Sequence, residues 1–285
     1  MKQSECQDIR VHKPDSPGDY IEFERAAFNA VAHTYDLWAG TARPFRQRLL
    51  ELSGIGDGGR LLDVACASGE LALDAAEMVG RDGRVVGIDL SDKMVEVARR
   101  KAAQRRAINV EFRRMDANTL DFPDETFDAV TCGIALHHFP DPGVVLREIH
   151  RVLKPGACLA ASAWKASYHS LIQHYGNELA VAGAAPGVSP PIPMGPRGLS
   201  EAVAQAGFHD PSEESVSTIA EFRDFDDYAA QMLGFAGRST ARFRGLPVET
   251  QEEAMIMAYD RLERDFKGGG GYRVPLEHSM ARGCK

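Results

Sequence analysis

Residues 61–72 read LLDVACASGELA, and they decide the fold because they join a short apolar strand to a helix through a tight turn. The apolar run at 60–65 predicts the strand, and the Ala- and Leu-rich stretch at 69–79, which stops at a glycine, predicts the helix. The same alternation continues along the chain. Further strands are predicted at 84–89, 109–115, 127–134, 157–163, 215–220 and 275–284, and further helices at 91–106 and 141–152. We therefore expect an α/β fold with a Rossmann-like, mostly parallel, seven-stranded sheet.

The turn itself has two interpretations, a cofactor-binding loop or a packing joint. Such loops usually carry glycine at two or three fixed positions, and here those positions hold Ala65, Ala67 and Gly69. The turn lies at the carboxyl end of the sheet, where open α/β sheets bind ligands. Small residues let a ligand approach the backbone, and the amino end of the helix attracts negative groups. Because alanine resists positive φ, we expect Ala65 and Ala67 in ordinary backbone regions if the turn binds a cofactor. Gly69 is the position that we expect to have no substitute.

The chain divides into five predicted segments. Residues 1–19 form a flexible tail, 20–53 form N-terminal helices over the site, and 54–222 form the core. Residues 223–270 form a late-inserted α-helical cap, and 271–285 return to the core. A loop with five prolines at 186–198 has the composition of a lid or binding loop.

Composition excludes several classes of function. A net charge of −8 argues against nucleic-acid binding, and the basic residues between 99 and 106 have the spacing of a solvated helix face. The amino-terminal residues hold no apolar signal segment, and no run approaches 18 apolar residues, so we expect no membrane span. The five cysteines are scattered without metal-ligand spacing, so we expect no metal site; they are Cys6, Cys66, Cys132, Cys158 and Cys284. Cys66, Cys132 and Cys158 lie in or beside apolar strands, so we expect them to be small buried residues. Together these features predict a reducing, cytoplasmic setting.

Two aspartates follow predicted strands and have the chemistry of nucleoside recognition. Asp89, at the end of the second strand, can accept hydrogen bonds from both hydroxyls of a ribose, or can serve as a turn residue before Ser91. Asp116, at the end of the third strand, can accept from an exocyclic amine such as that of adenine, or can again be a turn residue.

Together these motifs resemble the class I S-adenosylmethionine-dependent methyltransferases, from about residue 32 to 165. LLDVACASG is similar to their first motif, VVGIDLSDKMVEVAR to the second and FRRMDANTLDFPDETFDAVTC to the third and fourth. LHHFPDPGVVLREIHRVLKPGACL and AHTYD resemble the ubiquinone/menaquinone-biosynthesis C-methyltransferase branch and its small-molecule relatives.

The resemblance implies S-adenosyl-L-methionine as cofactor and S-adenosyl-L-homocysteine as product. Ala65 and Gly69 would line the methionine end, Asp89 would hold the ribose, and Asp116 would face the adenine amine. Cys132 would lie near the sulfonium, and Tyr35 would cover the site. The full implied cofactor set is Tyr35, Ala65, Ala67, Gly69, Asp89, Leu90, Met94, Asp116, Ala117 and Cys132.

A methyl acceptor with a hydroxyl or an acidic carbon also needs a base. His137 and His138 follow the fourth strand at the mouth of the site, where they can either act as that base or shape the turn before Phe139. Some related O-methyltransferases carry an orienting carboxylate near the end of the fifth strand, where this chain has Ala163 and Trp164.

We expect a hydrophobic small-molecule acceptor, methylated on O, C or N, in quinone-type or secondary-metabolite biosynthesis, and allow for a homodimer. Candidate wall residues are Trp38, Trp164, Tyr168, Phe225, Tyr228, Met232 and Phe235. The alternative is a cyclisation or rearrangement with the cofactor retained. No GxGxxG follows the first strand, which disfavours a nicotinamide dehydrogenase.

Overall fold

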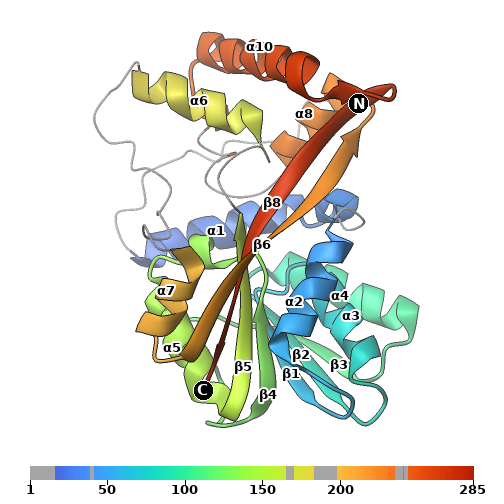
Figure 1. The fold of residues 1–285 in the computed structure, drawn as a ribbon, viewed down its shortest axis with the longest axis vertical. Coiled ribbons are helices and arrows are strands. Elements are labelled where there is room, and N and C mark those ends of the chain that lie inside the picture. Colours follow the sequence, from blue (N-terminus) through green and yellow to red (C-terminus); the bar gives the residue numbers. More distant parts are fainter. Residues whose placement is uncertain (1–16, 39–41, 165–169, 183–197, 235–239, 241–242) are drawn as a thin grey trace.

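The computed structural model describes residues 17–38, 42–164, 170–182, 198–234, 240 and 243–285, and its centre is one mixed sheet (Figure 1). The strands are β1 (Arg60–Val64), β2 (Arg84–Asp89), β3 (Val110–Arg114), β4 (Phe127–Cys132), β5 (Leu153–Trp164), β6 (His209–Phe222), β7 (Lys267–Gly268) and β8 (Gly271–Cys284). They lie in the order β3-β2-β1-β4-β5-β8-β6, and β7 pairs with β8. The predicted Rossmann-like sheet is confirmed, but it has eight strands rather than seven because residues 267–271 turn back as a short hairpin.

Strand direction gathers the carboxyl ends of five strands at one edge. β1 is parallel to both β2 and β4, and the chain reverses its direction of winding between β1 and β4. Such a switch point opens a crevice above the strand ends. β8 enters between β5 and β6 and is antiparallel to both of them, so the start of β8 lies at the same edge as the end of β5.

Helices cover both faces of the sheet (Figure 1). One face carries α2 (Arg43–Ser53), α3 (Glu70–Met78) and α4 (Asp92–Arg105), and the other carries α5 (Pro142–Val152) and α7 (Gly198–Gln205). α1 (Pro17–Val31) and the short helix η1 (Tyr35–Trp38) cross above the strand ends.

Two helix starts follow the predicted local chemistry. The Ser91 hydroxyl accepts a hydrogen bond from the Met94 N–H and caps α4. The Asp141 carboxylate accepts from the Gly143 N–H and caps α5, whose first residue is Pro142. Each cap satisfies a backbone donor that the helix leaves open and fixes the direction in which the chain leaves the strand edge.

The cap above the sheet is built from separate parts of the sequence. It contains α6 (Leu171–Ala182), α8 (Phe225–Gly234) and α10 (Val248–Asp265), and α6 packs on α10 (Figure 1). β6 and β8 run from the core into this cap, so their outer halves belong to both. α6 lies before residue 223 and has no counterpart in the predicted cap of 223–270, whose boundaries stay a prediction.

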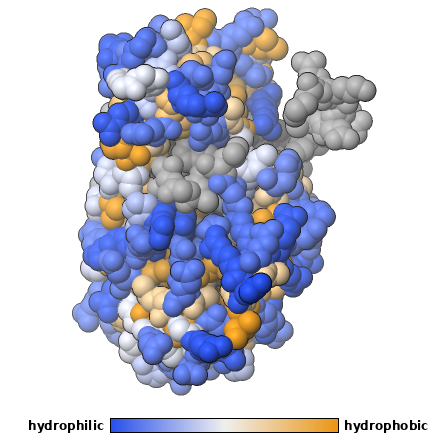
Figure 2. Space-filling model, turned by 90° about the vertical axis from the view of Figure 1, so that its right-hand side faces the viewer, coloured by the Kyte–Doolittle hydropathy of each residue, from blue (hydrophilic) through white to orange (hydrophobic). Residues whose placement is uncertain are grey.

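Hydrophilic residues cover most of the face seen in Figure 2, on the cap as well as on the core. The large apolar side chains of the cap, such as Tyr228 and Met232, are buried between its helices and the sheet. Within the described part of the chain, no helix combines the length and apolarity needed to cross a membrane.

Two cysteines that were expected to be separate thiols form a disulfide bond. Cys158 of β5 and Cys284 of β8 are opposite partners in the antiparallel pair, and they form a disulfide with their Cα atoms 4.0 Å apart. Spacing along the sequence cannot reveal this bond, because sheet register brings the two residues together across 126 positions. Cys66 and Cys132 are buried free thiols, as predicted. The cysteine argument for a reducing compartment therefore no longer holds.

Some expectations lie outside the described residues. These are the tail up to residue 16, most of the Pro-rich loop, and two of the predicted wall residues, Tyr168 and Phe235. The side chain of Trp38 also lies outside what the structure describes.

Candidate functional site

The turn between β1 and α3 has three residues with positive φ, and the expectation for its alanines was wrong. Ala65 has φ 56° and Ala67 has φ 47°, so both adopt the left-handed region, as Gly69 does at φ 86°. For alanine this conformation costs roughly 1–2 kcal/mol per residue. The turn therefore keeps the backbone shape of a glycine-rich loop although alanines occupy two of its positions.

Hydrogen bonds to neighbouring strand ends hold the alanines in this shape. The Cys66 N–H donates to the Ile88 carbonyl over 2.8 Å, and the Gly69 N–H donates to the Cys66 carbonyl over 2.9 Å. The Ala67 N–H donates to Oδ2 of Asp89 over 2.8 Å. Ile88 and Asp89 thus fix the turn from the end of β2, which explains how a strained backbone persists here.

Gly69 is required twice over, in agreement with the prediction that it has no substitute. Its φ favours glycine, and an added Cβ would lie 2.7 Å from Cζ of Phe112 and 2.8 Å from Cβ of Ala98. Gly69 therefore lets α3 start directly against the packed face of α4 and β3.

The Asp89 carboxylate accepts hydrogen bonds from the adjoining turns, as predicted for a turn residue, and can still accept from a ligand. Its Oδ1 accepts from the Ser91 N–H and its Oδ2 accepts from the Ala67 N–H, each over 2.8 Å. Burial raises the pKa of Asp89, and the backbone hydrogen bonds oppose that shift. A carboxylate offers about four lone-pair directions, so Asp89 can still accept from a hydroxyl donor. Leu90 follows at the strand end, and Met94 is fully buried in the first turn of α4.

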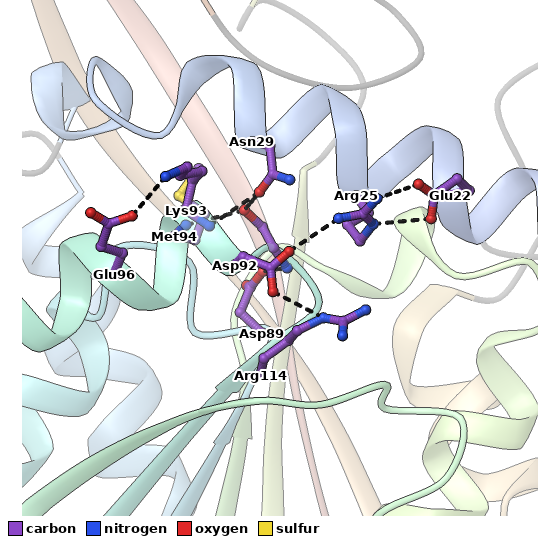
Figure 3. A network of polar contacts seen from close by, with 10 residues as sticks. Glu22, Arg25, Asn29, Asp89, Asp92, Lys93, Met94, Glu96 and Arg114 are labelled. Atoms are coloured by element: carbon purple, nitrogen blue, oxygen red, sulfur yellow. Dashed lines mark hydrogen bonds and ion pairs between the residues drawn. The ribbon is translucent and has the colours of Figure 1, made fainter.

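α1 closes over this corner, as Figure 3 shows. Arg25 of α1 donates to Asp92 over 3.0 Å, and Arg114 at the end of β3 reaches the same carboxylate at 3.2 Å. Asn29 of α1 accepts from the Ser91 hydroxyl over 2.6 Å. Arg25 and Asn29 of α1 therefore bind the start of α4 directly beside Asp89.

A cavity lies on the other side of the turn, above the ends of β1, β4 and β5. Its walls carry Tyr35, Asp36, Ala42, Phe45, Arg46, Leu49, Asp63, Ala65, Cys66, Ala67, Ser68, Glu70, Leu71, Gly133, Ile134, Ser162, Trp164, Leu276 and His278. Ala65, Ala67 and Ile134 among them have positive φ. A β-branched residue at φ 53°, as Ile134 is, is a backbone outlier, and such outliers concentrate where a site is shaped.

Asp63 contributes a buried carboxylate to this cavity, and the sequence pattern did not single it out as a site residue. It is 1% exposed, and its Oδ1 accepts from the Thr131 hydroxyl over 2.8 Å. Burial raises the pKa of Asp63 to about 7, while the hydrogen bond from Thr131 opposes the shift. A positively charged ligand group would stabilise its ionised form.

An ionic network fastens η1 to the turn. The Ser68 hydroxyl donates to Asp36 over 2.5 Å, and Nζ of Lys101 lies 2.6 Å from the same carboxylate. Lys101 also donates to Glu70 over 2.8 Å. This network holds Tyr35, which packs with Ala67 and Met94, over the cavity. Burial, with the neighbouring Asp89 carboxylate, raises the pKa of Tyr35, so its phenol stays neutral.

The remaining predicted cofactor residues lie at strand ends outside the cavity wall. Oδ1 of Asp116 accepts from both the backbone N–H and the side-chain amide of Asn118, over 2.9 and 2.8 Å, and the residue is half-buried. Ala117 and Cys132 are buried. Burial raises the pKa of the Cys132 thiol, which keeps it protonated. These positions line the same edge of the sheet as Asp89.

The two predicted histidines lie under α1. Nδ1 of His138 is 3.0 Å from Oε2 of Glu24, whose side chain is 6% exposed, and its ring meets Phe28 edge-on at 5.0 Å. His137 stacks obliquely on His138, with the ring centroids 4.1 Å apart. Glu24 thus supplies a carboxylate for an imidazole, from α1 rather than from the end of β5. No local pattern connects two residues that are 114 positions apart.

Comparison with known proteins indicates the family that the residues at this edge of the sheet resemble. Residues 61–156, from β1 to the start of β5, match the model of a methyltransferase domain. This segment, about a third of the chain, therefore has the sequence pattern of a methyltransferase domain. The matched segment holds the strained turn, Asp89, Asp116 and both histidines, so every predicted cofactor residue except Tyr35 falls inside it.

The methyltransferase domain is similar to quinone-modifying enzymes. Over 161 residues the chain is 35% identical to the ubiquinone/menaquinone biosynthesis C-methyltransferase of Teredinibacter turnerae, covering 54% of this chain and 65% of that protein. Over 154 residues it is 38% identical to the 2-phytyl-1,4-naphtoquinone methyltransferase of Synechococcus elongatus, covering 52% and 66%. The similarity thus spans slightly less than two thirds of these relatives.

The fold extends further than the sequence similarity. The solved structure of the YcgJ protein from Bacillus subtilis superposes with a TM-score of 0.57 at 21% identity, over 84% of this chain and 97% of that one. At this identity the likeness concerns the fold alone.

Proposed function

We propose that the chain is an S-adenosylmethionine-dependent methyltransferase that modifies a hydrophobic small molecule. One observation carries the proposal. The positive-φ turn of Ala65–Gly69 separates a corner that holds the Asp89 carboxylate from a cavity whose walls are largely apolar and aromatic. One side offers acceptors for a nucleoside and the other offers space for an apolar acceptor.

The residues present fit the cofactor. Asp89 would hold the ribose with its free lone pairs, and Asp116 would face the adenine amine beside Ala117 and Leu90. Asp63 and the backbone at Ala65 suit a positively charged methionine end, because a buried carboxylate there is stabilised by positive charge. When bound, S-adenosylmethionine supplies an electrophilic methyl carbon.

The protein's own contribution is alignment and exclusion of water. Tyr35 and the network of Asp36, Ser68 and Lys101 close one side of the cavity, and α1 closes the corner at Asp89. Holding two reacting centres in line can contribute on the order of 7–11 kcal/mol to a displacement. Alignment in a preformed pocket is therefore the main contribution that we propose for the protein.

The proposed acceptor is an apolar molecule of quinone or phenol type. The two curated relatives named above act on quinone-type compounds by name, and the cavity offers Phe45, Leu49, Trp164 and Leu276 to such a ring. His138, with Glu24 at its Nδ1, stays a candidate base, since Nε2 then carries the lone pair. No contact among the described residues favours a cyclisation or rearrangement.

The test is product formation. Purified protein is incubated with S-adenosylmethionine and a short-chain 2-prenyl-1,4-naphthoquinol, and S-adenosylhomocysteine and methylated quinol are measured by mass spectrometry. We expect both products in equal amounts, above a control without acceptor, and at least a tenfold lower rate for Asp89→Asn. Failure of the native protein to form either product with this quinol or with a panel of phenols would reject the proposal.

A further inference from the structure

His278 is a buried imidazole in the wall of the cavity, and nothing in the sequence marks it as a site residue. It lies on β8 directly opposite Trp164, the last residue of β5, and is 1% exposed. Leu276, two residues earlier on the same face of β8, lines the cavity as well. β8 therefore contributes two residues to the cavity wall beside the end of β5.

Three rings from three elements meet at this wall. The imidazole of His278 has its centroid 3.6 Å from that of Phe45 on α2 and 4.1 Å from that of Trp164, edge-on at 72°. All three side chains line the cavity. Aromatic walls favour flat, ring-shaped ligands that stack or meet them edge-on.

Resting on the proposed function, we propose that His278 binds the hydroxyl of a planar aromatic acceptor and takes up its proton. The acceptor's O–H bond breaks, its proton passes to a ring nitrogen of His278, and the electron pair stays on the acceptor oxygen. The resulting oxyanion is the nucleophile, either at oxygen or at a conjugated ring carbon. The other ionisable groups in the cavity wall are Tyr35, Asp36, Arg46, Asp63, Cys66 and Glu70.

The position of His278 distinguishes it from the histidine pair under α1. His138 contacts Glu24 and Phe28, on the side of the turn where Asp89 lies, and is not part of the cavity wall. His278 shares the cavity wall with the buried carboxyl group of Asp63. Ser162, two residues before Trp164 on β5, adds a buried hydroxyl to the same wall.

The test uses an acceptor analogue that reports its own ionisation. 4-Nitro-1-naphthol is bound to the full chain with S-adenosylhomocysteine, and the band of its phenolate is followed against pH. We expect the bound probe to ionise about one pH unit or more below the free probe. His278→Gln retains a polar side chain but cannot take up the proton, so this variant should bind the probe within a few-fold and lose the shift. His174→Gln, an exposed position on α6, is the matched control and should retain it.

The outcomes separate this inference from the proposed function. A shift that persists in His278→Gln and His278→Phe, or that disappears in His138→Gln instead, would overturn the role of His278. Absence of probe binding by the native protein would overturn it too, as would loss of probe binding in both His278 variants with unchanged thermal unfolding. Calorimetric titration with S-adenosylmethionine tests the proposed function independently, because His278 is not among its proposed contacts.

Discussion

At the scale of single residues, Gly69 combines backbone strain with a close approach, and its replacement tests both. Gly69→Ala should lower the free energy of unfolding by about 3 kcal/mol, since the new Cβ meets Phe112 and Ala98. Gly58→Ala is the matched control, because Gly58 has a similar φ of 74° but no atom within 4 Å of the added Cβ. It should cost about 1 kcal/mol. Equal losses in urea titrations of the two variants would contradict the packing argument.

Asp63 predicts a pH dependence of stability. Its pKa is about 7 in the fold, whereas an unfolded chain has a carboxyl pKa of about 4. Between these values the folded state holds a proton that the unfolded state lacks, so stability falls as pH rises through this window and levels off above about 7. Asp63→Asn removes this loss, so the stability difference between variant and native protein should grow in favour of the variant from pH 4 to 7. Parallel pH profiles in urea titrations would refute the assignment.

At the scale of elements, polar contacts fasten α1 to the start of α4, beside the apolar packing of Phe28 and Val31 on Met94 and Val97. Asn29 accepts from the Ser91 hydroxyl and from the Lys93 N–H at the start of α4. Asn29→Ala should speed amide hydrogen exchange of residues 20–31 about tenfold, which corresponds to about 1.4 kcal/mol. Arg25→Gln removes an exposed ion pair and should have little effect in the same measurement. Equal exchange in native protein and Asn29→Ala would show that α1 is held by other contacts.

The features that could be predicted from the sequence are those that depend only on neighbouring residues. The helix caps at Ser91 and Asp141, the alternation of strands and helices, and the singular role of Gly69 all follow from short stretches. The φ values of Ala65 and Ala67 do not, because hydrogen bonds from the end of β2 overrule the preference of alanine.

Contacts that depend on how distant segments pack could not be predicted from the sequence. Glu24 reaches His138 because α1 crosses the strand ends, and His278 reaches Trp164 because β8 runs antiparallel to β5. Neither juxtaposition leaves a periodic signal in the sequence. The cap was expected to contain residues 223–270, and α6 joined it through packing on α10.

At the scale of the whole molecule, the disulfide ties the last strand to the core. Cys284→Ser should lower the free energy of unfolding by about 3–4 kcal/mol, because the bond between Cys158 and Cys284 closes a long loop in the unfolded chain. Dithiothreitol should destabilise the native protein by a similar amount and leave Cys284→Ser unchanged. Cys132→Ser, at a buried free thiol, is the control whose response to dithiothreitol should match that of the native protein. A native protein insensitive to dithiothreitol would contradict the bond.

The central claim is that the turn at Ala65–Gly69 and Asp89 bind S-adenosylmethionine, and calorimetric titration tests it most directly. The native protein should bind one equivalent. Asp89→Asn, which keeps the shape of the side chain, should weaken binding at least tenfold, about 1.4 kcal/mol, because a neutral amide accepts less strongly from ribose hydroxyls. Asp92→Asn, at the neighbouring exposed carboxylate, should bind as the native protein does. Absence of heat with the folded native protein, or equal affinity for native protein and Asp89→Asn, would contradict the account.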